Sequence, residues 1–231
     1  AGFCLSKVDV LGELSPFTAA FLASVPFEFC AGAFIGGTVG YLSSFSLFFT
    51  VRQVLCLSLI GVVRLLVHKR IRKAETGWFP CLLAPVCAGA LAVAEEAVYG
   101  GELIGMGLAV LEGCLAFCSC WFFLKSFRIP VRRIGLFNIP VSDRLCLGLS
   151  GFTFVMCASG VSFEGFSPAR LCSFLLVCFG AYCKGIPAGS ALGVCLGAAL
   201  SIAPENRFVF SAFALGGLIG GVFAPMGQVA V

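Results

Sequence analysis

Two clusters of basic residues flank one long apolar hairpin, and this arrangement constrains the fold more than any other sequence feature. The hairpin covers residues 78–124 and contains the pair Gly100-Gly101 near its middle. Ten of the fifteen Lys and Arg residues lie beside it: Arg64, Lys69, Arg70, Arg72, Lys73, Lys125, Arg128, Arg132, Arg133 and Arg144. Because Lys and Arg near span ends are retained in the cytoplasm, loops 68–77 and 125–144 are predicted to be cytoplasmic.

The composition excludes a soluble globular protein. Hydrophobic residues make up 60% of the 231 residues and charged residues only 11%, which is too few polar side chains to cover a soluble fold. The chain is therefore predicted to be an integral membrane protein whose first partner is the lipid bilayer. Its net charge of +4 comes from loops that flank apolar segments, so we expect no nucleic-acid binding.

The apolar pattern predicts an all-α, polytopic transmembrane bundle in a single domain, residues 1–231. Nine apolar segments are expected to span: 17–27, 30–43, 45–67, 78–99, 102–124, 145–161, 169–183, 186–203 and 207–223. The longer ones suffice for a hydrocarbon core of ~30 Å at 1.5 Å per residue. A helix preceding residue 1, of which residues 1–5 would be the tail, would make ten spans with both ends of the chain cytoplasmic.

Glycines spaced by four residues indicate close helix contacts. Gly32, Gly36 and Gly40 share one helix face, and the glycine-rich segment 189–197 has the same spacing. Near the C-terminus, we expect a close-packed helix face formed by Gly216, Gly217, Gly220 and Gly221. In lipid, such small residues let two helix backbones approach closely, so these faces are predicted to pack against neighbouring helices.

No catalytic, cofactor or metal site is predicted. Most of the fourteen cysteines lie singly in apolar segments, where they behave as small hydrophobes, and His68 is the only histidine. Glu95, Glu96 and Glu102 form one acidic cluster, which we interpret as a solvated rim at the outer end of the hairpin rather than a cation site. The glycine-rich segments lack the Lys-Ser/Thr ending of a phosphate-binding loop.

Two ionisable residues lie deep in predicted spans. Glu112 stands ten residues inside its span, or ~15 Å deep, and Arg52 stands seven residues inside its own, or ~10 Å deep. A charge at the bilayer centre costs about 2.5 to 3.5 kcal/mol on insertion scales, so each needs a partner or a function. We predict that Arg52 and Glu112 form an intramembrane ion pair.

Three stretches resemble a known family. Residues 2–23 read GFCLSKVDVLGELSPFTAAFLA, residues 180–197 read GAYCKGIPAGSALGVCLG, and residues 215–231 read LGGLIGGVFAPMGQVAV. Their order and spacing are similar to the opening, the Gly/Ala-rich span and the closing span of the membrane region of stage II sporulation protein E. That family's arrangement of ten spans agrees with the count given above.

The resemblance implies a function in bacterial sporulation. Members of that family carry the membrane region before an oligomerising segment that contacts the tubulin-like division protein, and then a PP2C-type serine phosphatase dependent on manganese or magnesium. The phosphatase activates the forespore sigma factor through an anti-anti-sigma factor. Its paired metal-binding aspartates have no counterpart here, where Asp9 and Asp143 are isolated and no other Asp occurs.

Two functions are therefore expected from the sequence. The first is a membrane anchor, itself without enzymatic activity, that forms homo-oligomers and locates the phosphatase among septal proteins of the bacterial cell membrane. The alternative is a small-solute transporter or channel that uses intramembrane Glu112 and Arg52. That alternative usually requires polar groups near the midplane and an internal repeat, and no repeat is detectable.

Overall fold

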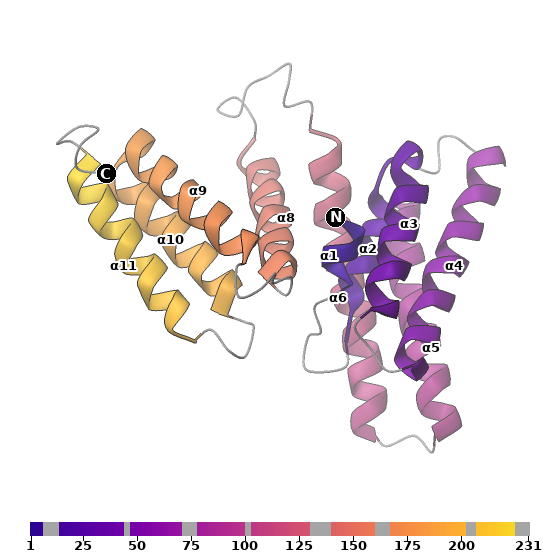
Figure 1. Cartoon of the computed structure of the whole chain (residues 1–231). Coiled ribbons are helices and arrows are strands. Elements are labelled where there is room, and N and C mark those ends of the chain that lie inside the picture. Colours follow the sequence, from indigo (N-terminus) through magenta and orange to yellow (C-terminus); the bar gives the residue numbers. More distant parts are fainter. Residues whose placement is uncertain are drawn as a thin grey trace. The chain divides into compact units, whose positions relative to one another are not determined.

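Every secondary-structure element that the structure describes is a helix. In this computed structural model the described residues are 1–6, 14–43, 47–70, 78–99, 103–129, 140–159, 167–201 and 207–224. The helices are α1 (Gly2–Leu5), α2 (Pro16–Ser24), α3 (Phe27–Leu42), α4 (Leu47–Arg70), α5 (Phe79–Tyr99), α6 (Leu103–Phe127), α8 (Val141–Ser159), α9 (Pro168–Lys184), α10 (Ile186–Ser201) and α11 (Arg207–Phe223). Figure 1 shows them in chain order.

The all-helical prediction is confirmed, and nine of these helices correspond to the nine predicted apolar segments. Four contain stretches long and apolar enough to cross a membrane: Phe49–His68, Phe79–Val98, Ile104–Phe127 and Val141–Ser159. The prediction of a span over residues 17–27 is wrong. Helix α2 has only nine residues, about 14 Å of length, and its surroundings are protein. How many of the remaining helices span stays a prediction.

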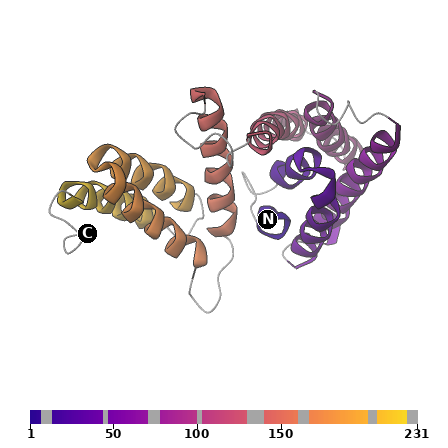
Figure 2. The same cartoon turned by 90° about the horizontal axis from the view of Figure 1, so that it is seen from above.

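The described residues form two compact units, residues 1–150 and 151–231, and the boundary falls within α8. In the first unit, the short helix α2 lies in the centre and packs against α4, α5 and α6 (Figures 1 and 2). Its length follows from two prolines. Pro16 occupies the first turn, where its missing N–H is tolerated, and Pro26 stands just beyond the last turn. Eight of its nine residues are buried.

Glycines on α3 make room for three neighbours of that helix, α1, α2 and α4. An added Cβ at Gly36 would lie 3.2 Å from the backbone nitrogen of Phe3 in α1, and Gly40 also faces this segment. An added Cβ at Gly37 would meet Thr18 of α2 and Leu57 of α4. Gly32 faces open space, so the predicted glycine face includes Gly36 and Gly40 but not Gly32.

Helices α5 and α6 form the predicted central hairpin. Near one end Trp78 lies against Trp121, with ring centroids 4.7 Å apart, and Cys120 Sγ donates to the Pro80 carbonyl at 3.2 Å. This end adjoins the basic flanks, since α4 ends at Arg70 and α6 ends two residues beyond Lys125. Tryptophan is enriched at membrane interfaces, so the pair marks one interface beside the basic flanks.

The second unit contains α9, α10 and α11, which pack together (Figure 1). A single residue, Gly185, separates α9 from α10 and has φ of +68°, a conformation that side chains with a Cβ rarely adopt. Along α10, Gly189, Gly193 and Gly197 face the backbone carbonyls of Gly217, Phe213 and Phe210 in α11. The predicted close packing of segment 189–197 is confirmed.

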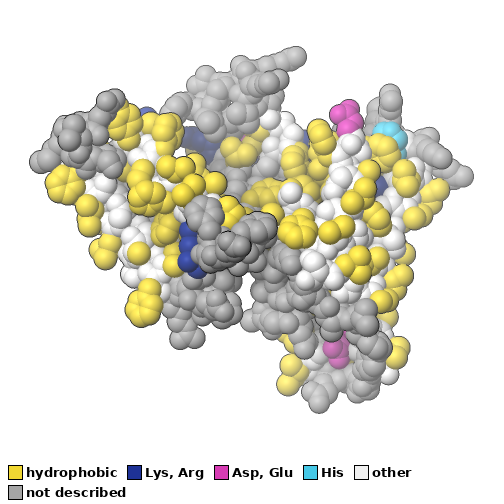
Figure 3. Space-filling view, in the orientation of Figure 1, with side chains coloured by type: hydrophobic (Ala, Val, Ile, Leu, Met, Phe, Trp, Pro, Cys, Tyr) yellow, Lys and Arg dark blue, Asp and Glu magenta, His cyan; other side chains and the backbone are white. Residues whose placement is uncertain are grey.

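The outer faces of the helices are apolar. Exposed side chains include Leu55, Leu59 and Val62 on α4 and Phe174, Leu175 and Phe179 on α9. Figure 3 shows hydrophobic side chains over much of one face of the molecule. Large exposed apolar side chains on every long helix are what a bilayer-facing surface requires.

Candidate functional site

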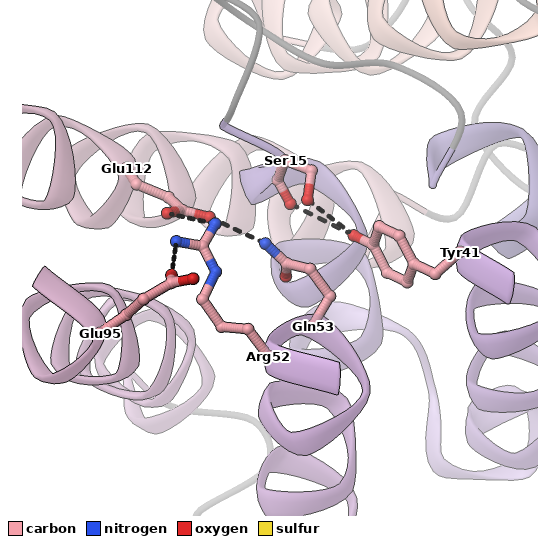
Figure 4. Close-up of polar contacts among 6 residues, drawn as sticks. All are labelled: Ser15, Tyr41, Arg52, Gln53, Glu95 and Glu112. Carbon is pink, nitrogen blue, oxygen red and sulfur yellow. Dashed lines mark hydrogen bonds and ion pairs between the residues drawn. The ribbon is translucent and has the colours of Figure 1, made fainter. Parts of the chain in front are cut away.

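A cluster of charged side chains joins α4, α5 and α6 inside the first unit (Figure 4). Arg52 Nη1 donates to Glu95 Oε2 at 2.6 Å, and Arg52 Nη2 lies 3.4 Å from Glu112 Oε2. The structure thus brings together the two residues predicted to pair and adds a third. The side chains of Arg52 and Glu95 are 16% and 29% exposed, whereas that of Glu112 is only 2% exposed.

Polar groups around Glu112 continue toward the start of α2. Gln53 Nε2 donates to Glu112 Oε1 at 3.3 Å, and the backbone N–H of Ser15 faces this carboxylate. Ser15 Oγ lies 3.0 Å from the hydroxyl of Tyr41, a side chain with no exposed surface (Figure 4). One oxygen of this buried carboxylate, Oε1, therefore has a hydrogen-bond donor, as most buried polar atoms do.

Arg64 occupies the opposite end of α2. It is 4% exposed, and its Nη1 donates to the carbonyl oxygen of Leu22 at 2.5 Å. The sequence placed Arg64 with the basic flank of the hairpin, and this prediction is wrong. Residue 64 falls on the inward face of α4, eleven residues after Gln53, so the helix carries it into the bundle.

The two buried charges match the dipole of α2. The start of a helix carries partial positive charge and unpaired N–H groups, and its end carries partial negative charge and unpaired carbonyls. Glu112 lies at the start, beside the Ser15 N–H, and Arg64 lies at the end, beside the Leu22 carbonyl. An isolated helix end is costly away from water, so these two residues make a nine-residue helix tolerable inside a membrane domain.

On the inward face of α4, an apolar layer separates two polar positions, Gln53 and Arg64. The inward face of this helix reads Gln53, then Cys56, Leu57 and Ile60, then Arg64. The three middle side chains are at most 2% exposed. Eleven residues of helix put about 16 Å between Gln53 and Arg64. This part of the interior therefore has a polar cluster, an apolar layer and a single arginine, in that order.

The predicted C-terminal glycine face is present in part. An added Cβ would collide with Gly189 at Gly217 and with Ile186 at Gly221, and at Gly220 it would lie 3.5 Å from the Ala181 Cβ. Gly216 is the exception, because an added Cβ there meets nothing within 4 Å. One residue of a helix turns by about 100°, which places Gly216 outside the contact that Gly217 makes.

The structure locates three of the predicted topology determinants. Lys69 and Arg70 belong to the last turn of α4, and Arg128 follows α6 and is exposed. Arg72, Lys73, Arg132 and Arg133 lie outside the described residues, as does Glu102 of the predicted acidic rim. The orientation of the chain in the membrane stays a prediction.

No group of three or more His, Cys, Asp or Glu residues that could hold a metal ion occurs within the described ranges. None of the fourteen cysteines, all of which lie in the described ranges, takes part in a disulfide. Cys81 and Cys120 contact each other between α5 and α6, both without exposed surface. These residues therefore contribute packing to the hairpin.

Sequence reasoning missed Glu95 as a partner of Arg52 and Glu96 as a side chain packed between α5 and α6. They were interpreted as a solvated rim, yet Glu95 holds Arg52, and Glu96 lies between α5 and α6 against Gly105. A signal was available in the spacing of α6. Gly105, Ala109 and Glu112 share one face, and a glycine one helix turn from the hairpin tip leaves space for a side chain from α5.

Comparisons with known proteins agree with the resemblance noted in the sequence. No curated protein and no solved structure matches this chain. The family described as "SpoIIE, N-terminal domain" matches residues 1–231, which is the full length of the chain. The chain therefore belongs to the SpoIIE N-terminal domain family.

Proposed function

We propose that this chain is the membrane anchor of a sporulation phosphatase and that it locates the enzyme at the asymmetric septum of a bacterial cell. The observation that carries the proposal is the family match over all 231 residues. The four helices long enough to cross a bilayer and the apolar outer faces support a position within the membrane. In this proposal the chain itself has no enzymatic activity.

The partners follow from the same proposal. A PP2C-type serine phosphatase that uses manganese or magnesium would be attached to the anchor, and its activity would lead to activation of the forespore sigma factor. Contacts with septal division proteins and with further copies of this chain would keep the phosphatase in place. None of these functions requires a cofactor in the membrane domain.

The test is localisation in sporulating cells. A fluorescent protein fused after Val231 should concentrate at the asymmetric septum, whereas the same fluorescent protein fused to an unrelated multi-pass protein should label the whole membrane. An even distribution of the test fusion along the cell would contradict septal positioning. Soluble fluorescence after cell breakage would contradict anchoring itself.

A second candidate function, transport of a small solute, has one observation in its favour. The short helix α2 begins inside the bundle beside the charged groups of Arg52 and Glu112, and transporters bind solutes at such interrupted helices. The apolar layer of Cys56, Leu57 and Ile60 weighs against a conducting path. Liposomes containing the purified chain should therefore show no solute flux above that of empty liposomes.

A further inference from the structure

The charged cluster contains more acidic than basic groups. Among the described side chains, the carboxylates of Glu95, Glu96 and Glu112 gather near a single guanidinium, that of Arg52. The guanidinium of Arg52 lies closer to the Glu95 carboxylate, at 2.6 Å, than to the Glu112 carboxylate, at 3.4 Å. Its positive charge therefore stabilises ionised Glu112 less than ionised Glu95. Buried charges are costly unless they are balanced, and full ionisation would leave this cluster net negative.

One oxygen of Glu112 has no hydrogen-bond partner among the residues that the structure describes. Oε1 accepts from Gln53, but Oε2 faces Arg52 without the geometry of a hydrogen bond. Because the side chain is only 2% exposed, bulk water does not compensate this oxygen. An unpartnered carboxylate oxygen inside a protein is rare and indicates a missing proton, water or ion.

Glu112 also lines a small cavity. Its volume is about 20 Å³, enough for one water-sized particle, and its polar lining consists of Arg52, Glu96 and Glu112. Gly105 also lines it, and an added Cβ there would collide with the Glu96 carboxylate. Glycine at this position therefore allows Glu96 to lie between α5 and α6, beside Glu112.

We propose that Glu96 and Glu112 form a binding site for one monovalent cation, either a proton shared through the cavity or an ion of the size of sodium. A single positive charge would balance the excess and supply the partner that Glu112 Oε2 lacks. Within the described residues, the polar and titratable groups facing Glu112 are Arg52, Gln53 and Cys56 from α4, Glu95 and Glu96 from α5, Tyr41 from α3 and the Ser15 N–H before α2.

The geometry points to binding rather than passage. Glu95 and Glu96 are partly exposed near the end of α5, which gives the cavity an access side. On the other side, the inward face of α4 continues with the buried residues Cys56, Leu57 and Ile60. The site is therefore accessible from only one side, the end where α5 and α6 are joined, and is closed on the other side by apolar residues. This inference is independent of the anchoring function.

The experiment uses a hydrophobic carbodiimide, which modifies protonated carboxyl groups within membranes. The purified full chain in lipid nanodiscs is labelled over a range of pH, once in choline chloride and once in sodium chloride, and adducts are located by mass spectrometry. Glu112 should be labelled, whereas the exposed carboxyl of Glu28 serves as the internal reference. A proton site predicts that labelling falls by about tenfold per pH unit above its midpoint. A sodium site predicts protection by sodium at constant pH.

A matched pair of glycine variants tests the geometry. Gly105→Ala should displace Glu96 and shift the pH midpoint or the sodium protection, whereas Gly107→Ala, whose added Cβ meets nothing within 4 Å, should behave like the wild type. Glu112→Gln should remove the adduct. The proposal would be overturned if Glu112 were labelled no more than Glu28, if its labelling ignored both pH and sodium, or if both glycine variants gave the same response.

Discussion

The helices within each of the two compact units are stabilised by contacts that differ in kind between the units. The first contains buried charges, with Arg52 beside Glu95 and Glu112, and Arg64 on the carbonyl of Leu22. In the second, three glycines of α10 lie against backbone carbonyls of α11. Lipid provides no hydrophobic force between helices, so a membrane domain depends on polar contacts or on close backbone packing. The first unit combines both solutions, since glycines of α3 also pack closely against α1, whereas the contacts described in the second unit are close backbone packing.

The difference shows where a function beyond packing can reside. Contacts between glycines and backbone carbonyls bring helices together but contribute no titratable side chain that could take up a proton. The charged cluster of the first unit costs free energy to bury, and a merely structural contact could be replaced by apolar residues without loss. We therefore expect proton or ion binding, if it occurs, in the first unit.

The largest effect is expected from Arg52→Leu. Removing the guanidinium leaves Glu95 and Glu112 without their shared partner, which should cost about 3–5 kcal/mol of unfolding free energy. Glu112→Leu should cost less, because Arg52 keeps its contact with Glu95. The double variant should recover much of the loss seen in Arg52→Leu. Unfolding in detergent measures each value, with Leu59→Ala on the exposed face of α4 as the control.

If the effects of Arg52→Leu and Glu112→Leu were simply additive, the two charges would not interact. The contrast between the units would then lose its main support, since the first unit would also be held by packing alone. Adding Glu95→Leu to this cycle separates the two acidic partners of Arg52.

Arg64→Leu is expected to have the next largest effect. It leaves the Leu22 carbonyl without its charged donor, and hydrogen bonds to charged groups contribute about 1.5–3 kcal/mol. Arg64→Lys should retain part of this, because an ammonium can also donate to a carbonyl. Unchanged unfolding of the Arg64→Leu variant in detergent would show that the end of α2 needs no side-chain partner.

Adjacent glycines of α11 test the second unit. Gly217→Ala forces a Cβ against the Gly189 carbonyl and should destabilise the unit by about 1–3 kcal/mol, the usual cost of overpacking. Gly216→Ala faces open space and should be neutral or stabilise by up to about 1 kcal/mol through helix propensity. Thermal unfolding of the two variants side by side provides the comparison. Equal midpoints would contradict close packing at Gly217.

The smallest effect is expected for an ion pair at the surface. Lys125 Nζ lies 3.0 Å from Asp143 Oδ1, and each side chain is about one-third exposed. Solvent and salt screen such pairs, so a double-mutant cycle with Lys125→Ala and Asp143→Ala should show no measurable coupling. A clear coupling that vanished at high salt would show that charge alone, without burial, stabilises the first unit.

The helices were predictable from the sequence, while the partners of the charges were predictable only in part. Apolar segments bounded by Pro, Gly and basic residues correspond closely to the helices, because these signals are local. Arg52 and Glu112 could be predicted to pair because they lie at similar depths along their helices. The partners of Glu95 and Arg64 could not be predicted, because they depend on how each helix is rotated in the bundle. Likewise, Gly216 and Gly217 are distinguished only by that rotation.

The short helix α2 also has a consequence for biogenesis. A segment of nine residues, about 14 Å long, does not leave a translocon as an independent transmembrane unit. Its end is held by Arg64, which is synthesised about forty residues later, and its start by Glu112, which follows nearly fifty residues after that. Residues 16–24 therefore reach their final place only after Glu112 of α6 has been made, so this segment settles later than its position in the sequence suggests.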